Sequence, residues 1–398
     1  MLGKEYRMSC KIVVFGAGAT GRAHVGLLGW QAGYGIVFVD KKPELVKILK
    51  NANQYRVNLY GNKIEEITVT GYTIYSFEER ESIADEISDS DLVLTAVFDQ
   101  NLSDVAKTIA LSVRKMRLKG RTDPLNFIAC ENMMDSSTCL KKYVRELLDL
   151  EDIEYLEKYL GFPDCMISRV VPVPENPLVI IAEDYNEWTA CAESFKGEKP
   201  RNLDTLELVK DQTARLERKL FIHNGGHAVC GYFGFHRGWK YIHEAVGDPV
   251  VAEHVLGALD ELGEVVKKKH GFSAESIELY KKDLVRRGSV PEMKDEILRV
   301  IRDPARKLSP KERLVAPVVF AYNNGLSRKW IIKGITAALK CYHPADLQSA
   351  DLNDKINKFG LKKVLENVCG LDKYPELAKE IIKEWDNWNI KRFNNEKS

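Results

Sequence analysis

A glycine-rich turn between two apolar runs is the feature that most constrains the fold of this chain. Residues 10–15 are rich in β-branched side chains, the sequence Gly-Ala-Gly-Ala-Thr-Gly follows at 16–21, and residues 35–40 resemble a second strand. That strand ends in an aspartate. Strand, tight turn, helix, strand and acid in this order are typical of a dinucleotide-binding βαβ unit. The first half is therefore predicted to be an α/β, Rossmann-type domain with a largely parallel sheet.

The residues of the turn have distinct predicted roles. Gly16 permits the tight turn, Gly18 lets the backbone approach a pyrophosphate, and Gly21 lets helix and strand pack closely. Free N–H groups at the start of the helix are expected to face the phosphates, and Arg22 is predicted to contact the cofactor here as well. Asp40 lies 19 positions beyond Gly21. A carboxylate about 20 residues on takes the ribose hydroxyls, so Asp40 favours NAD as the cofactor, while Lys41 and Lys42 leave room for NADP.

The rest of the first half is expected to extend this sheet. Apolar runs typical of buried parallel strands lie at 91–97 and 125–130. Alternating runs at 54–60 and 67–75 are typical of a hairpin-like insertion. Extended segments at 164–174 and 178–182 are expected to end the sheet. Ligands of open α/β sheets lie beyond the carboxyl ends of the strands, so Thr95 and Val97 are predicted to contact the cofactor. Glu131 and Asn132 follow another strand end. They suit contact with substrate or nicotinamide, and equally a helix cap or a turn.

The second half has the periodicity of helices. A polar, turn-rich segment at 194–202 precedes it, and from residue 204 onwards apolar residues recur at helical spacing. Helices are expected at 219–234, 250–269, 273–287, 290–302, 311–322, 330–342, 353–368 and 374–388. The chain is thus predicted to consist of a cofactor-binding domain at 1–200 and an all-α substrate and catalytic domain at 201–398.

An amine, a carboxamide and an imidazole lie close together in the first of these helices. On a regular α-helix His227 lies about 80° and Asn224 about 140° round from Lys219, so one wall of a pocket can carry all three. A base and two hydrogen-bond donors suit proton removal from an alcohol and stabilisation of the resulting alkoxide. Lysine has an ordinary pKa of about 10.4, and it acts as a base near neutrality only where burial or nearby positive charge lowers that pKa.

Composition excludes several other classes of function. The net charge is +1, so no basic field favours nucleic acid or an anionic membrane as a partner. None of the eight cysteines forms a Cys-x-x-Cys pair. His223 and His227 lie four residues apart without a third ligand at useful spacing, so no metal site is predicted. The N-terminus is too polar for a signal peptide, and no apolar run approaches the ~20 residues that span a bilayer. We therefore expect a reducing, cytoplasmic setting.

The motif Lys219-x-x-x-x-Asn224-x-x-His227, behind the glycine turn, resembles the polyol-specific long-chain dehydrogenase family. The stretches that carry this resemblance run over about three-quarters of the chain, at 15–22, 95–97, 129–132, 169–172, 217–227, 268–272 and 302–309. Several independent motifs in the right order make the resemblance specific.

The resemblance implies a hydride transfer between NAD and a carbon of a sugar alcohol or its phosphate. It assigns the general base to Lys219 and the contacts with the alkoxide oxygen to Asn224 and His227. For the substrate it implies contacts with Asn132, with Arg306 and, through a phosphate, with Lys307. The basic segment 302–313 suits an anionic group, although a solvated basic loop explains it as well.

The first candidate substrates are mannitol 1-phosphate and fructose 6-phosphate. Two alternatives keep the reaction but change the substrate to an unphosphorylated polyol or a keto-hexuronate. A third alternative is a protein that senses a dinucleotide without turnover. The expected partner is a small molecule, and the expected state is a monomer or small homo-oligomer.

Overall fold

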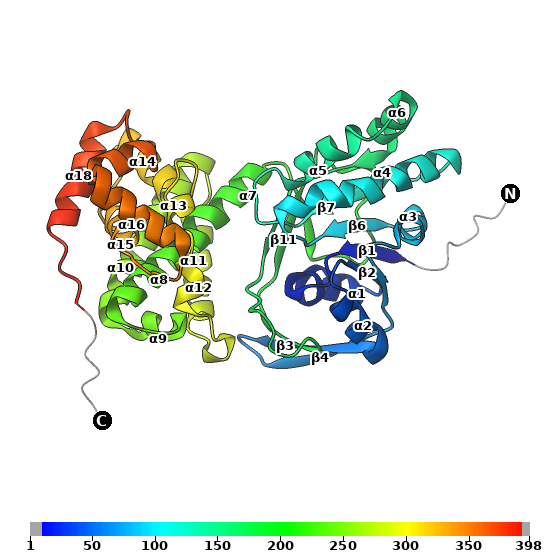
Figure 1. The fold of residues 1–398 in the computed structure, drawn as a ribbon, viewed down its shortest axis with the longest axis horizontal. Coiled ribbons are helices and arrows are strands. Elements are labelled where there is room, and N and C mark those ends of the chain that lie inside the picture. The colour runs from blue at the N-terminus through cyan, green and yellow to red at the C-terminus, as the bar shows by residue number, and fades with distance from the viewer. Residues whose placement is uncertain (1–9, 392–398) are drawn as a thin grey trace. The chain divides into compact units, whose positions relative to one another are not determined.

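A six-stranded parallel sheet forms the centre of the first part of the chain (Figure 1). Every neighbouring pair of its strands runs in parallel. In order across the sheet they are β5 (Thr73–Ser76), β2 (Gly35–Asp40), β1 (Lys11–Phe15), β6 (Leu92–Thr95), β7 (Leu125–Ala129) and β8 (Leu160–Gly161). The structure, a computed structural model, describes residues 10–391. The chain divides into two compact units between Leu216 and Glu217.

Both faces of this sheet are buried, which explains why its strands are continuous apolar runs. In β1, Ile12 and Val14 belong to one core, and Val13 and Phe15 to the other. The second of these cores is covered by α3 (Arg80–Ser88), α4 (Leu102–Leu118), α5 (Ser136–Arg145) and α6 (Leu150–Tyr159), with η2 (Asp99–Asn101) leading into α4. The first is covered by η1 (Gly21–Gly26), α1 (Leu27–Gln31), α2 (Pro43–Ala52) and the strands β3 and β4.

Two three-stranded sheets complete the first unit and correct two predictions. Their strands are β10 (Val179–Glu183), β3 (Gln54–Tyr60) and β4 (Glu65–Thr70) in one, and β12 (Leu206–Val209), β11 (Glu187–Cys191) and β9 (Cys165–Ser168) in the other. The hairpin-like pairing expected from 54–60 and 67–75 is confirmed in β3 and β4, which run antiparallel, but the second run does not continue in the same sheet as far as residue 75. Gly71, with φ +70°, separates β4, which pairs with β3, from β5, which joins the main sheet. The helical pattern expected from residue 204 is also wrong at its start, where β12 pairs with β11.

The second unit is helical, as predicted (Figure 1). Its helix α8 (Asn224–Arg237) packs against α9 (Ile242–Gly247), α10 (Pro249–His270), α12 (Ile297–Val300) and α15 (Lys329–Leu339). The remaining elements from the end of the first unit onwards are α7 (Gln212–Arg218), η3 (Lys219–His223), α11 (Ala274–Gly288), η4 (Pro291–Met293), α13 (Pro304–Lys307), α14 (Val315–Asn323), α16 (Leu347–Phe359), α17 (Leu361–Asn367) and α18 (Pro375–Asp386). Among the described residues, no helix is both long enough and apolar enough to cross a membrane.

Two predicted helices of this unit are interrupted by residues with positive φ. The segment 290–302 is not one helix, because Lys294 adopts φ +44° after the short η4, and α12 begins only at Ile297. The segment 353–368 is divided at Gly360, with φ +82°, which ends α16 and starts α17. An α-helix does not continue through a left-handed residue.

Candidate active site

The glycine turn after β1 is built by close backbone contacts. Gly16 adopts φ +96°, and its N–H donates to the carbonyl of Val39 at 2.7 Å. A Cβ atom at Gly16 would lie 2.3 Å from the carbonyl oxygen of Ala96, and one at Gly21 would lie 1.9 Å from the carbonyl oxygen of Gly16. At Gly18 a Cβ would meet no atom within 4 Å. The turn thus requires glycine at two positions for its own packing and leaves open space at the third, which fits a dinucleotide whose pyrophosphate approaches Gly18.

Asp40, at the end of β2, is tied to this turn. One carboxylate oxygen accepts the N–H of Ala17 at 2.8 Å, and the other accepts the N–H of Lys42 at 2.9 Å. Each carboxylate oxygen keeps a further acceptor position. Asp40 therefore holds the glycine turn in place, and the predicted contact with the ribose is compatible with both hydrogen bonds.

Removing the Asp40 carboxylate is expected to weaken NADH binding and to relax discrimination against NADPH. The change Asp40→Ala deletes the predicted ribose contact and the anchor of Ala17 together, and it removes the charge that repels a 2′-phosphate. Fluorescence titrations with NADH and NADPH measure both effects. Asp104→Ala, at an exposed carboxylate paired with Lys107 in the same unit, is the control. An unchanged preference between the two cofactors would contradict the assignment of Asp40.

Arg22 supports the turn from inside the protein. Its side chain is 1% exposed, its Nε donates to the carbonyl of Ala17 at 2.7 Å, and its Nη1 donates to the carbonyl of Pro177. The hydroxyl of Tyr55 donates to the Arg22 carbonyl at 3.1 Å, and burial lowers the pKa of the guanidinium. Sequence reasoning placed Arg22 among the cofactor contacts; the structure places its side chain beneath the loop.

At the carboxyl edge of the sheet, Thr95 and Val97 share a buried carboxylate. The hydroxyl of Thr95 donates to Glu131 at 2.7 Å, and the N–H of Val97 donates to the same side chain at 3.0 Å. Glu131 is 8% exposed, and burial raises its pKa to about 7 against the opposing effect of these two donors. Asn132, the predicted substrate contact, is exposed beside it. The sequence indicates Glu131 and Asn132 together as polar residues after β7, and only the structure shows that Glu131 is buried and Asn132 exposed.

Folding stability is expected to depend on the ionisation of Glu131. The folded protein holds this proton up to about pH 7, whereas an ordinary glutamate releases it near 4.5. The stabilisation is therefore complete below pH 4.5 and is lost as the pH rises through 7. In Glu131→Gln this dependence is absent, so the stability of the variant relative to wild type should rise by about 2 kcal/mol between pH 5 and pH 8.

Urea unfolding of both proteins at the two pH values measures this difference. Glu81→Gln, at an exposed carboxylate of α3 that pairs with Lys115, serves as the control for loss of one charge. Parallel stability curves for wild type and Glu131→Gln would show that Glu131 is already ionised in the folded protein at pH 5.

In the second unit, Lys219, Asn224 and His227 stand out by their exposure. From residue 219 to residue 234 every side chain is buried except these three and Leu220. The apolar residues between them pack into the helical core. A run that buries all its other residues except Leu220 and leaves an amine, an amide and an imidazole partly exposed is compatible with the predicted site wall.

The helix that carries these residues is not a regular α-helix at its start. Lys219–His223 forms a π-helical turn, and the N–H of Asn224 donates both to the carbonyl of Leu220 and to the carbonyl of Lys219, five residues earlier. A π turn holds one more residue than an α turn and recurs at functional sites. Asn224 therefore lies closer to the face of Lys219 than the α-helical separation of about 140° indicates. A second π turn, η1, begins at Gly21 in the glycine motif.

His227 has an acidic partner that the sequence did not indicate. Its Nε2 lies 2.8 Å from a carboxylate oxygen of Asp295. One turn before His227, His223 is buried. Burial lowers the pKa of His223 well below its ordinary value, and the positive charges of Arg287, His227, Lys219 and Arg313 lower it further. Cationic groups thus gather on this side of the second unit, which suits an anionic substrate group.

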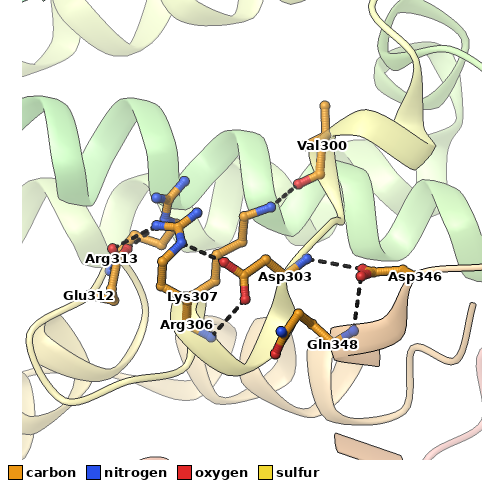
Figure 2. A network of polar contacts seen from close by, with 8 residues as sticks. All are labelled: Val300, Asp303, Arg306, Lys307, Glu312, Arg313, Asp346 and Gln348. Carbon is orange, nitrogen blue, oxygen red and sulfur yellow. Dashed lines mark hydrogen bonds and ion pairs between the residues drawn. The ribbon is translucent and has the colours of Figure 1, made fainter. Parts of the chain in front are cut away.

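The basic segment 302–313 is partly neutralised by acids (Figure 2). Arg306 donates to Asp303 at 2.7 Å and to Glu312 at 3.0 Å, and Arg313 donates to Glu312 at 2.9 Å. Lys307 is 6% exposed and donates to a backbone carbonyl; burial and the charges of Arg313 and Arg306 lower its pKa to about 7. Of the two predicted substrate contacts here, Arg306 has a half-exposed side chain, whereas the amine of Lys307 points into the protein.

Other parts of the described chain carry no predicted site residue. A shallow hollow of about 490 Å³ in the first unit, between α5 and α6, is lined by Thr138, Lys141, Lys142, Arg145, Glu146, Ile153 and Glu157. Its cations Lys141 and Arg145 pair with Glu157. Within residues 10–391, no group of three or more His, Cys, Asp or Glu side chains is arranged to hold a metal ion.

Comparison with known proteins identifies the family. The family models described as "Mannitol dehydrogenase Rossmann domain" and "Mannitol dehydrogenase C-terminal domain" match residues 10–203 and 213–389. The mannitol-1-phosphate 5-dehydrogenase of Thermoanaerobacter pseudethanolicus is 34% identical, over 94% of this chain and 97% of its own length. The enzyme of the same name from Oceanobacillus iheyensis is 35% identical, with the same two coverages.

A solved structure shares the fold. The Pseudomonas fluorescens mannitol 2-dehydrogenase in ternary complex with NAD and D-mannitol superposes with a TM-score of 0.76 at 16% identity, over 95% of this chain and 92% of that one. The fold and both domain matches agree. The chain belongs to the mannitol dehydrogenase family.

Proposed function

We propose that this protein is an NAD-dependent oxidoreductase that interconverts mannitol 1-phosphate and fructose 6-phosphate. The names and the full-length similarity of the relatives support this substrate pair. The observation that carries the reaction is the burial pattern of residues 219–234, in which Lys219, Asn224 and His227 stay partly exposed while the residues around them form core. The chemistry of these three groups is that of alcohol oxidation.

In the proposed mechanism, Lys219 removes the proton of the substrate hydroxyl in its uncharged form. Asn224 and His227 donate hydrogen bonds to the oxygen and stabilise the negative charge that develops on it. NAD, which the glycine turn and Asp40 would hold, would supply the hydride acceptor for this oxidation. The cationic surroundings of His223 favour an uncharged amine at Lys219, because positive charge disfavours protonation of a neighbouring amine.

For substrate recognition we propose that Arg306 contacts the phosphate and that Asn132 orients the sugar chain. Arg306 is held by Asp303 and Glu312 with half of its side chain exposed, and a fixed guanidinium suits paired hydrogen bonds to phosphate oxygens. Lys307, from its buried position, is assigned to an indirect role, since its amine holds the carbonyl of Val300.

The deciding experiment compares possible ketone substrates side by side in an NADH-oxidation assay. Fructose 6-phosphate is expected to be reduced with the highest kcat/KM, ahead of fructose and of the common keto-hexuronates. Reduction of a keto-hexuronate in preference to fructose 6-phosphate would make the protein a hexuronate reductase, and preference for fructose would make it a polyol dehydrogenase. NADH binding without turnover of any of them would indicate a dinucleotide-sensing protein.

A further inference from the structure

The partner of His227 is held in one orientation by its surroundings. The backbone of Asp295 accepts the N–H of Ile242 at 2.9 Å, and two residues on, Ile297 donates its N–H to the carbonyl of Lys240 at 2.9 Å. The second carboxylate oxygen of Asp295 receives the guanidinium of Arg299, with Nε at 3.0 Å. Backbone and side chain are thus fixed together, and the carboxylate has little freedom to leave the imidazole.

Charge as well as geometry couples the two residues. The side chain of Asp295 is 11% exposed and that of His227 is 21% exposed. Burial alone would raise the pKa of Asp295, but the attraction of His227 and then of Arg299 lowers it to about 2. The aspartate therefore carries its charge throughout the neutral range. A carboxylate that is this firmly ionised binds an N–H and does not donate to the ring.

The hydrogen bond decides which proton His227 can offer. Because Nε2 faces a carboxylate, a neutral ring carries its proton on Nε2, and Nδ1 is then only an acceptor. A doubly protonated ring donates from both nitrogens. Within residues 10–391, Nδ1 of His227 makes no hydrogen bond, whereas Nε2 is engaged. Donation to a substrate oxygen therefore requires the charged ring with Nδ1–H as the donor, and a carboxylate beside Nε2 is the group that stabilises this form.

We propose that Asp295 is the positioning residue of His227: it binds Nε2–H, commits Nδ1 to the substrate oxygen and stabilises the imidazolium that donates to that oxygen. This inference rests on the proposed function for the identity of the oxygen. The pairing itself does not depend on the substrate. Arg299 acts in the opposite sense, because it competes for the same carboxylate. Among the described residues, the other charged or titratable groups near this pair include Lys219 and His223 on η3, Cys230 on α8, Arg287 on α11, and Arg313.

The test combines NMR with kinetics on the full-length protein. In Asp295→Asn the side chain keeps its shape and loses its charge. The ¹⁵N resonances of His227 are expected to change from a single tautomer to a mixture, and the doubly protonated fraction at pH 7 should fall, because the carboxylate that stabilises it is gone. The kcat for fructose 6-phosphate should fall by about 10- to 100-fold, less than for the loss of a whole oxyanion donor, with KM little changed.

Two further variants distinguish a positioning role of Asp295 toward His227 from a purely structural role. Asp295→Glu retains the charge and should recover most of the protonated fraction and part of kcat. Arg299→Gln removes the competing cation and should raise the protonated fraction. Asp260→Asn, at an exposed carboxylate that pairs with Lys281, is the matched control and should change neither quantity.

Wild-type His227 resonances that persist in Asp295→Asn would overturn the inference, as would a protonated fraction in Asp295→Glu as low as that in Asp295→Asn. Failure of the proposed function has a different signature, because wild-type protein would then leave NADH unoxidised with fructose 6-phosphate. The resonances of His227 would still report on its partner in that case.

Discussion

Replacement of Lys219 by alanine is expected to lower kcat by about 10³- to 10⁴-fold, near the upper end of what a positioned general base contributes. NADH affinity should stay the same, because the predicted cofactor contacts lie in the first unit, around Gly18 and Asp40. Lys219 begins the π turn with its side chain partly exposed, so this side chain does not fill the core. The effect should therefore appear in turnover and not in the unfolding curve.

Three measurements check this expectation. Steady-state kinetics give kcat, NADH titration gives the affinity, and added methylamine should restore part of the rate in Lys219→Ala by supplying the missing base. Lys355→Ala, at an exposed lysine of the same unit that pairs with Asp351, is the matched control. A Lys219→Ala protein with the wild-type rate would remove Lys219 from the mechanism.

The second large effect is expected at Gly18. A methyl group at this position meets no protein atom within 4 Å, so Gly18→Ala should leave stability unchanged within about 0.5 kcal/mol. It should nevertheless weaken NADH binding by about 100-fold, or ~2.7 kcal/mol, because the added methyl occupies the space that a pyrophosphate approaches. Loss of ligand affinity without loss of stability is the mark of a binding surface.

Gly21 and Gly247 provide the comparison. Gly21→Ala puts its Cβ 1.9 Å from a backbone oxygen and should lower the melting temperature as well as the affinity. Gly247→Ala, in the second unit, also adds its methyl to open space and should change neither. Calorimetry gives the melting temperature of the three variants, and NADH titration gives their affinity. Wild-type affinity in Gly18→Ala would place the pyrophosphate elsewhere.

Sequence reasoning found those parts of the fold whose signals are local. The strands β1, β2, β6 and β7 are predictable because each is buried on both faces and reads as an unbroken apolar run. The helices of the second unit follow from their spacing. By contrast, β12 has only four residues, and it is recognised as a strand only from its pairing with β11. A sequence segment that short does not distinguish a strand from the start of a helix.

In the site, residue identities were predictable and their contacts were not. Lys219, Asn224 and His227 form a recognisable spacing, but the partner of His227 lies 68 residues further on. Asp295 follows Lys294, which has a positive φ, in a segment predicted as helix. Likewise, the number of positive residues in 302–313 gave no hint that Lys307 turns its amine inward to a carbonyl while Arg306 remains half exposed.

The π turn at Lys219 has a consequence for transplanting this chemistry into other scaffolds. Lys219 and Asn224 are five residues apart, which is the spacing of the π-type hydrogen bond from the Asn224 N–H to the Lys219 carbonyl. On a regular α-helix, the same spacing would place the two side chains about 140° apart. Copying the motif letter by letter onto an ideal helix would therefore separate the amine from the amide. A designer would have to shorten the interval to three or four residues, or carry the widened turn along with the motif.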